Sequence, residues 1–146
     1  KEILGLLADL PKNELELTER FYRDLEFGTG GLRAPMGMGQ NRMNKYNVRR
    51  ATQVLANNVI KNFGKGGNAV VSYDSRHNSK EFAKEVAGVF AANGIKAYIF
   101  SALTPTPMLS FGVRYFKAHA GVMITASHNP PIYNGFKAFW NDGAQV

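Results

Sequence analysis

The sequence AGVMI at residues 120–124 is a continuous apolar run, and it leads directly into TASHNP at residues 125–130. Such a run is typical of a strand buried on both faces of a parallel sheet. The loop after it carries a hydroxyl, an imidazole and an amide, and Pro130 and Pro131 exclude helix and β-ladder there. Polar groups on a stiff loop at the end of a strand are typical of a functional site.

The adjacent Ser127 and His128 suggest the nucleophile and base of a serine hydrolase. Successive residues of an extended segment point to opposite faces, however, so His128 is badly placed to accept a proton from Ser127. The flanking residues also differ from the Gly-x-Ser-x-Gly pattern of a nucleophile elbow. From these residues alone, a functional serine and a serine that merely caps a turn at the end of a strand both remain open.

Strand-like and helix-like segments alternate before this run. The expected strands span residues 69–73, 95–100 and 120–125, and the expected helices span 47–64 and 79–93, with a third introduced by 104–107. Short connections between such elements imply right-handed crossovers. We therefore predict an α/β fold with three layers, helix/sheet/helix, around a mostly parallel sheet. Residues 136–140 are expected to add an antiparallel edge strand, which makes the sheet mixed.

The N-terminal part of the chain is predicted to be different. Residues 1–26 are expected to form a helical segment, because Leu17, Phe21 and Leu25 recur at helical spacing within 14–26. A glycine-rich stretch then runs from Gly28 to Gly39, with room for a short strand at 32–34. Further along, Asn47 and Ser79 are predicted to cap the helices that they precede.

Composition limits the classes of function. The 146 residues carry a formal net charge of +7 and no cysteine, which excludes disulfides and thiolate metal sites and favours a reducing, cytoplasmic compartment. No apolar run is long enough to cross a bilayer, so we expect no membrane partner. The positive charge predicts an anionic partner, either nucleic acid or a sugar phosphate. Because the basic residues are scattered and no nucleic-acid-binding motif is present, we favour the sugar phosphate.

Polar segments follow three of the predicted strands, at residues 74–76, 104–107 and 127–129. Ligands of open α/β sheets bind outside the carboxyl ends of the strands, so we expect these segments to meet at one crevice. Asp74 and Arg76 are expected to form an internal ion pair or to brace a loop. His77 and His119 are expected to lie on the surface.

Longer segments resemble a known family. The sequence GVMITASHNPP at 121–131, followed by YNGFK at 133–137, resembles the phosphoserine loop of the α-D-phosphohexomutases, which include phosphoglucomutase and phosphomannomutase. FGTGGLR at 27–33 is similar to the family's N-terminal segment, although Gly30 stands where many relatives have Ser or Ala. NRMN at 41–44 and TQVLAN at 52–57 look most like the branch with phosphoglucomutase and phosphopentomutase activities.

The resemblance implies a phosphoryl shuttle. Phosphorylated Ser127 would transfer its phosphoryl group to a hexose or pentose phosphate, between the 1- and 6- (or 5-) positions, through a bisphosphate. Arg33 is implied as a phosphate-binding cation, Asn129 as a loop-shaping and phosphate-binding residue, and His128 or Lys137 as the general base. Mg²⁺ bound to the Ser127 phosphate is implied as cofactor, and a sugar 1,6-bisphosphate as activator and intermediate.

The family's enzymes have four domains, and residues 27–146 resemble the first of them. The family's Asp-x-Asp-x-Asp magnesium loop does not occur in this sequence. We therefore expect the aspartate ligands to lie outside this chain and the remaining domains of the same polypeptide to be its partners. By itself, the chain is expected not to turn over substrate.

Overall fold

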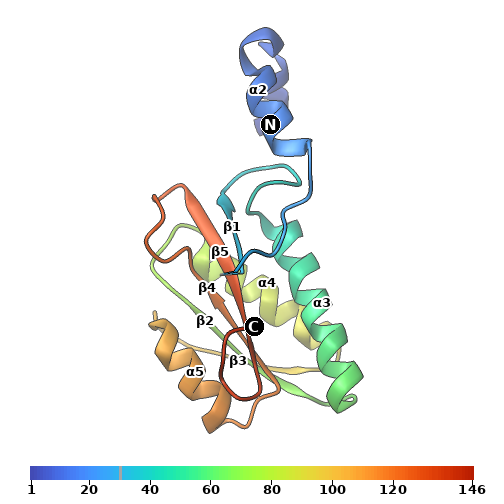
Figure 1. Ribbon diagram of the computed structural model, residues 1–146, viewed down its shortest axis with the longest axis vertical. Coiled ribbons are helices and arrows are strands. Elements are labelled where there is room, and N and C mark those ends of the chain that lie inside the picture. Colours follow the sequence, from blue (N-terminus) through green and yellow to red (C-terminus); the bar gives the residue numbers. More distant parts are fainter. Residues whose placement is uncertain (30) are drawn as a thin grey trace.

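A mixed sheet forms the centre of the computed structural model, which describes residues 1–29 and 31–146. The helices are α1 (Glu2–Leu7), α2 (Leu10–Phe21), α3 (Lys45–Phe63), α4 (Ser79–Ala92) and α5 (Thr106–Tyr115). The strands are β1 (Leu32–Pro35), β2 (Asn68–Tyr73), β3 (Lys96–Ile99), β4 (Ala120–Ile124) and β5 (Tyr133–Trp140). Within the described residues these strands lie in the order β1-β5-β4-β2-β3 (Figure 1).

The strand directions follow from the connections. β2 pairs in parallel with β3 and with β4, because α4 and α5 provide the crossovers. β5 pairs antiparallel with β4 on one side and with β1 on the other. The predicted α/β fold with a mostly parallel, mixed sheet is therefore confirmed. The antiparallel strand β5 lies one place in from the edge, because β1 pairs with its outer side.

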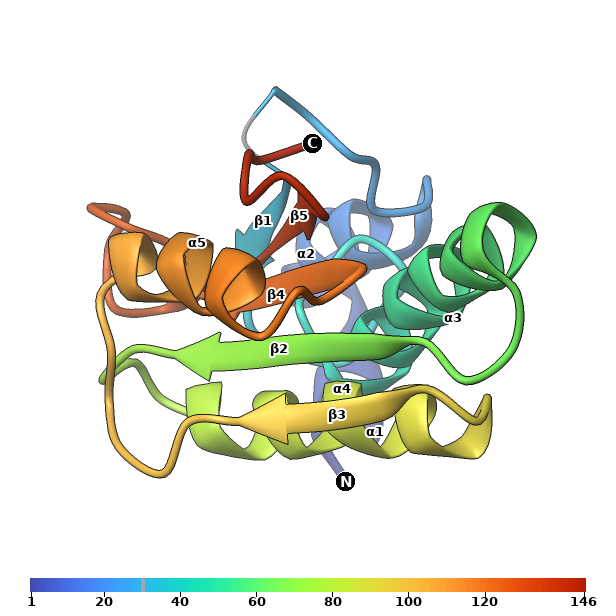
Figure 2. The same cartoon turned by 90° about the horizontal axis from the view of Figure 1, so that it is seen from below.

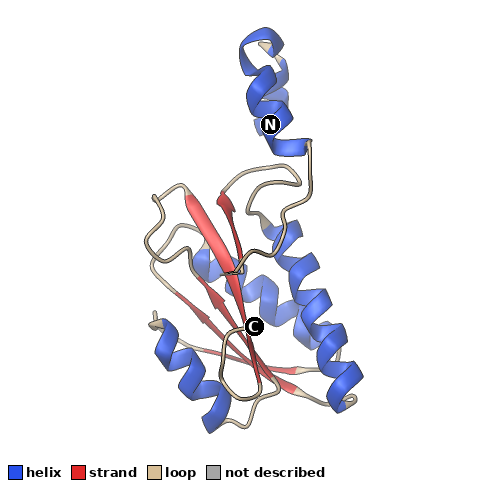
Figure 3. Ribbon diagram, in the orientation of Figure 1, coloured by secondary structure: helices blue, strands red, loops and turns tan. Residues whose placement is uncertain are grey.

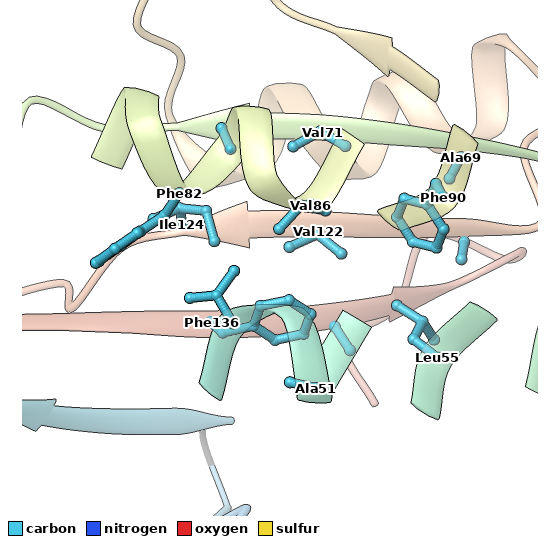
Figure 4. Packing of buried hydrophobic residues seen from close by; sticks show 14 of the residues in the cluster. Ala51, Leu55, Ala69, Val71, Phe82, Val86, Phe90, Val122, Ile124 and Phe136 are labelled. Atoms are coloured by element: carbon cyan, nitrogen blue, oxygen red, sulfur yellow. The ribbon is translucent and has the colours of Figure 1, made fainter. Parts of the chain in front are cut away.

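Helices cover both faces of the sheet and produce the three layers, with α3 and α4 on one face and α5 on the other (Figure 2). The two faces follow from the alternation of side chains along a strand. In β2, Val71 joins the core under α3 and α4, whereas Val70 joins the core under α5. Figure 4 shows the larger of the two cores, in which Phe136 of β5 and Phe90 of α4 are fully buried.

The N-terminal helical segment extends away from the sheet and consists of two helices (Figure 1). Pro11 lies in the first turn of α2, a position where its missing N–H breaks no helical hydrogen bond. The prediction of a helix over residues 14–26 is wrong at both ends, because α2 begins at Leu10 and ends at Phe21. Tertiary contacts outweigh the helical spacing that Leu25 suggested: the Leu25 N–H donates to the carbonyl of Gln40 instead (3.0 Å).

A buried arginine connects this segment to the rest of the fold. Arg20 of α2 forms ion pairs with Glu2 of α1 and Glu16 of α2 (2.5 and 2.7 Å), and it donates a hydrogen bond to the carbonyl of Met38 (2.9 Å). A buried guanidinium requires such partners. Arg20 therefore links α1 and α2 to the loop before α3.

Both predicted helix caps are wrong by one helical turn or less. Asn44 caps α3, because its side-chain oxygen accepts from the N–H groups of Tyr46 and Asn47 (3.1 Å each). The amide of Asn47 donates backward to the loop carbonyls of Gln40 and Arg42. At α4, the N-cap position belongs to Asn78, which has a φ of 61°, and Ser79 is the first helical residue. Among the described residues, no helix is both long and apolar enough to span a membrane.

Candidate functional site

The loops that follow β2 and β4 meet at one rim of the sheet, because the two strands are parallel neighbours (Figure 3). The Asp74 N–H donates to the carbonyl of Ile124 at the end of β4 (3.2 Å), and the Thr104 N–H donates to that of Tyr73 at the end of β2 (3.3 Å). The segments at 74–76 and 127–129 therefore meet as predicted, whereas residues 104–107 contact the end of β2 and are not among the residues that line the cavity at this rim. A polar cavity of about 300 Å³ lies here, lined by Asp74, Ser75, Arg76, His77, Ser127, Asn129 and Pro131.

Ser127 is exposed on the loop between β4 and β5, residues 125–132, which we call the Ser127 loop. Its φ of 54° lies in the left-handed region, which costs a residue with a Cβ about 1 kcal/mol. Side chains hold both of its backbone polar groups. The N–H donates to Thr125 Oγ1 (2.9 Å), and the carbonyl accepts from Arg76 Nη2 (2.7 Å). These contacts offset the conformational cost and fix the backbone of the candidate nucleophile.

Arg76 binds the Ser127 loop through a side chain that is mostly buried. Its two terminal nitrogens donate to four backbone carbonyls, those of Ser127 (2.7 Å), Asn129 (2.6 Å), Pro130 (3.0 Å) and Tyr133 (3.1 Å). Its Nε lies 3.6 Å from the Asp74 carboxylate. The prediction that Asp74 and Arg76 form an ion pair or brace a loop is confirmed, because they do both.

Asp74 accepts hydrogen bonds on both carboxylate oxygens. Oδ1 accepts from the Arg76 N–H (3.0 Å) and from the Ser79 hydroxyl (2.8 Å), and Oδ2 accepts from the Thr125 hydroxyl (2.5 Å). Ser79, which was predicted to cap α4, instead helps to hold this carboxylate. Asp74 therefore joins the start of α4 to the end of β4.

Arg33 reaches the Ser127 loop from β1, where its Nη1 donates to Asn129 Oδ1 (3.1 Å). On β5 its partner is Gly135, where a Cβ would lie 2.5 Å from the carbonyl oxygen of Thr125. Glycine is therefore required if β1, β5 and the end of β4 are to approach this closely. Gly30, three residues before Arg33, lies outside the described residues.

Lys137 lies half-buried on β5, two residues after Gly135 and therefore on the same face of the sheet as Arg33. Burial lowers the pKa of Lys137 below its ordinary value, and the charge of Arg33 lowers it further, while that of Asp74 opposes the change. A lowered pKa increases the neutral fraction of a lysine, which is the form that accepts a proton.

The three histidines differ in their surroundings. His128 is exposed on the Ser127 loop, and His77 is exposed as predicted. The prediction for His119 is wrong, because its ring is half-buried with its centroid 4.6 Å from that of Phe63. Its Nδ1 also lies 3.1 Å from the backbone nitrogen of Asn68, at the start of β2. The proximity of two chain segments produces this burial, which no local pattern indicated.

The side chains at this rim do not fit a magnesium site by themselves. Among the described residues, no group of three His, Asp or Glu side chains could hold a metal ion. The nearby carboxylate, Asp74, already accepts from Ser79, Thr125 and the Arg76 backbone. Ser127 offers only its hydroxyl. A metal ion at this rim would need carboxylate ligands from other residues.

Two features were missed in the sequence. Thr125 lies two residues before Ser127 and contacts its N–H, a local pattern typical of hydroxyl-stabilised turns that could have indicated its role. The second is a mostly apolar groove of about 600 Å³ between α3, β5 and the C-terminal segment. We call it the α3 groove, lined by Phe27, Ala51, Val54, Leu55, Asn58, Asn62, Ala138, Trp140, Asp142, Ala144, Gln145 and Val146.

Comparison with known proteins gives consistent matches. Residues 24–146 match the family model described as phosphoglucomutase/phosphomannomutase, alpha/beta/alpha domain I. A phosphopentomutase of Mus musculus is 42% identical over 142 residues, covering 92% of this chain and 23% of the relative. A phosphoglucomutase of Staphylococcus haemolyticus is 44% identical over 126 residues, covering 86% of this chain and 23% of the relative.

Solved structures agree with the sequence matches. The crystal structure of a phosphomannomutase-type protein from Thermus thermophilus superimposes with a TM-score of 0.78 at 33% identity. The match covers 85% of this chain and 27% of that structure. The chain thus spans about a quarter of the length of the relatives that it matches.

Proposed function

The chain belongs to the phosphoglucomutase/phosphomannomutase family, as a domain I, and from this premise we propose that Ser127 carries the phosphoryl group of a sugar-phosphate mutase. The observation that carries the proposal is the hydrogen bond of Arg33 to Asn129 on the Ser127 loop, with Lys137 close enough for the charge of Arg33 to lower its pKa. Ser127 is presented on a braced loop, Arg33 and Asn129 form a hydrogen bond beside it, and Lys137 lies on the adjoining strand.

The proposed reaction has two phosphoryl transfers. In the first, a hydroxyl of a hexose or pentose phosphate attacks phosphorylated Ser127, so that a sugar O–P bond forms and the Oγ–P bond breaks. The sugar bisphosphate then returns its other phosphoryl group to Ser127, which moves phosphate between the 1- and 6- (or 5-) positions. A serine is suited to this task because phosphoserine persists between turnovers, with a charge of about −1.5 to −2 at neutral pH.

The acceptor hydroxyl must lose a proton in each transfer. We assign that proton to Lys137 Nζ, because burial and the charge of Arg33 both lower the pKa of Lys137. His128, the other candidate base, is exposed to solvent on the Ser127 loop, whereas Lys137 is half-buried on the strand beside Arg33. Arg33 would bind the transferred phosphate through its planar guanidinium, and Asn129 would orient Arg33 through their hydrogen bond (3.1 Å).

Family membership also suggests Mg²⁺, which would neutralise negative charge on the phosphoryl group when bound. Because the described residues do not form a carboxylate site for it, its ligands would come from elsewhere in the full-length polypeptide. We propose that those further domains also supply the sugar contacts, so that residues 1–146 alone are inactive. A sugar 1,6-bisphosphate would serve as activator, in a cytoplasmic enzyme with neither nucleic-acid nor membrane partners.

The test is the intact mass of the full-length protein after incubation with glucose 1,6-bisphosphate. We expect a phosphate increment in the wild type and none in Ser127→Ala, together with loss of mutase activity in the variant. An increment that persists in Ser127→Ala would overturn the assignment. Robust mutase activity from purified residues 1–146 would contradict the proposed need for further domains.

The same materials test the alternatives. A serine hydrolase would be labelled at Ser127 by a fluorophosphonate, which we do not expect from a serine that lacks a nucleophile elbow. A nucleic-acid-binding module would bind a random duplex below micromolar concentration at physiological salt, with an affinity that falls steeply as salt increases. Either result would replace the mutase proposal.

A further inference from the structure

One carboxylate is connected to both backbone polar groups of Ser127. Oδ2 of Asp74 accepts from the Thr125 hydroxyl (2.5 Å) and lies 3.6 Å from Arg76 Nε. Thr125 in turn accepts from the Ser127 N–H (2.9 Å), and Arg76 donates to the Ser127 carbonyl (2.7 Å). Two side chains thus hold the peptide groups on either side of the Ser127 Cα, and Asp74 contacts both.

The direction of these hydrogen bonds is set by the chemistry of the groups. A threonine hydroxyl has a single hydrogen, and a carboxylate can only accept, so the Thr125 hydrogen points to Asp74. Its lone pairs are then free to accept from the Ser127 N–H. Because Thr125 is only 4% exposed, water competes little for this hydroxyl. Asp74 therefore fixes the orientation in which Thr125 can bind Ser127.

We propose that Thr125, oriented by Asp74, is a positioning residue that holds Ser127 in its left-handed conformation for phosphoryl transfer. This inference rests on the proposed function of Ser127. In-line transfer requires the oxygen, phosphorus and acceptor to be aligned, and small displacements of a reacting group have large effects on rate. Without the Thr125 hydroxyl, the strained φ of 54° loses one of the two hydrogen bonds that hold it.

The test compares Thr125→Val with Thr125→Ser in the full-length protein. Valine keeps the shape of threonine but lacks the hydroxyl, whereas serine keeps the hydroxyl and should rescue. Thr52→Val is the matched control, because Thr52 is also buried and its hydroxyl donates to the Val48 carbonyl within α3 (2.7 Å). We expect Thr125→Val to lower kcat by roughly tenfold to a hundredfold. KM for the sugar phosphate should stay within about twofold, because Thr125 is buried and its hydroxyl is engaged by Asp74 and Ser127.

In Thr125→Val, the rate at which glucose 1,6-bisphosphate phosphorylates Ser127 in a single turnover should fall by the same factor as kcat. In Thr125→Ser and in Thr52→Val, this rate should stay near that of the wild type. A Thr125→Val variant with wild-type kcat, or a Thr125→Ser variant as slow as Thr125→Val, would overturn the inference while the phosphoserine proposal stands. A wild type that incorporates no phosphate at Ser127 would overturn the proposed function and this inference with it.

Discussion

The polar rim at Ser127 and the α3 groove are both cavities of this domain, but they are built differently. The groove has about twice the volume, roughly 600 Å³ against 300 Å³, and its lining is mostly apolar. The rim is smaller, and its charged groups are bound to the backbone, as Arg76 is bound to three carbonyls of the Ser127 loop and to that of Tyr133 in β5. The comparison teaches that the two cavities suit different ligands: converging, partly desolvated polar groups at the rim are typical of a reaction site, and the larger volume of the groove is not by itself a sign of chemistry.

The largest expected difference between rim and groove comes from removing the proposed base, Lys137. In the full-length protein, Lys137→Met should lower kcat by about 10²- to 10⁴-fold, because the acceptor hydroxyl then keeps its proton. The pH profile should change as well: wild-type kcat/KM should rise with pH as Lys137 loses its proton, and this limb should be absent in the variant. Val54→Thr in the α3 groove is the control, with activity expected within about twofold. Equal losses in both variants would remove the distinction between rim and groove.

Arg76→Lys tests whether the rim depends on a forked donor. A lysine ammonium cannot reach four carbonyls at once, so we expect the free energy of unfolding of the chain to fall by about 2 to 3 kcal/mol. Arg114→Lys, at an exposed position of α5, should change it by less than about 0.5 kcal/mol. Urea unfolding measures both. A stable Arg76→Lys chain would show that charge alone, without the fork, supports the loop.

Glycine substitutions test the close approach of strands at the rim. Gly135→Ala places a Cβ 2.5 Å from one backbone oxygen and 2.7 Å from another, so we expect a loss of about 2 kcal/mol. Gly88→Ala in α4 meets nothing within 4 Å and should instead stabilise the chain by about 0.5 to 1 kcal/mol. Thermal unfolding of the two variants measures both changes in stability, the expected loss for Gly135→Ala and the expected gain for Gly88→Ala. A loss at Gly88 or none at Gly135 would contradict the geometry.

The smallest expected effect concerns the stability of the fold against pH. The pKa of Lys137 is lower in the folded than in the unfolded chain, so the unfolded state binds the proton more tightly. This difference lowers the free energy of unfolding. The loss is complete at any pH below the pKa of Lys137 in the folded chain, and it disappears as the pH rises through the pKa of Lys137 in the unfolded chain. Lys137→Met should therefore raise the unfolding temperature near neutral pH. The corresponding gain in the free energy of unfolding should be below about 1 kcal/mol and should become smaller at high pH. A gain that grows with pH would contradict the direction of the shift.

The fold was largely predictable because apolar runs and helical spacing are local properties. The strand and crossover pattern over residues 69–140 is an example, since the spacing of apolar residues within each element predicts both its type and its buried face. Errors arose where neighbouring segments decide the outcome. Asn44 and Asn47 are equally good caps by residue type, and the position of the preceding loop makes Asn44 the cap.

The residues proposed for the site could be named from the sequence, but their contacts could not. Ser127, Arg33 and Lys137 were proposed through a family resemblance, and strand order brings β1 and β5, which carry Arg33 and Lys137, next to β4, which leads to Ser127. The four carbonyl contacts of Arg76 depend on loop geometry that no spacing reveals, and Thr125 was quoted in the motif without a role. Backbone hydrogen bonds from side chains leave little trace in sequence, because many residue types can make them.

The antiparallel pairing of β4 with β5 has a consequence for correct folding. It places Met123 opposite Lys137, so Ser127 and Lys137 come from one strand–loop–strand unit and are ten residues apart in the chain, at 127 and 137. Pairing of strands this close in the chain has a small loop-closure cost. A slip of one residue in the pairing would turn Lys137 toward the side of the sheet where Phe136 is buried. A chain that mispairs these strands would therefore bury a charge, and the cost of that burial disfavours the mispaired form.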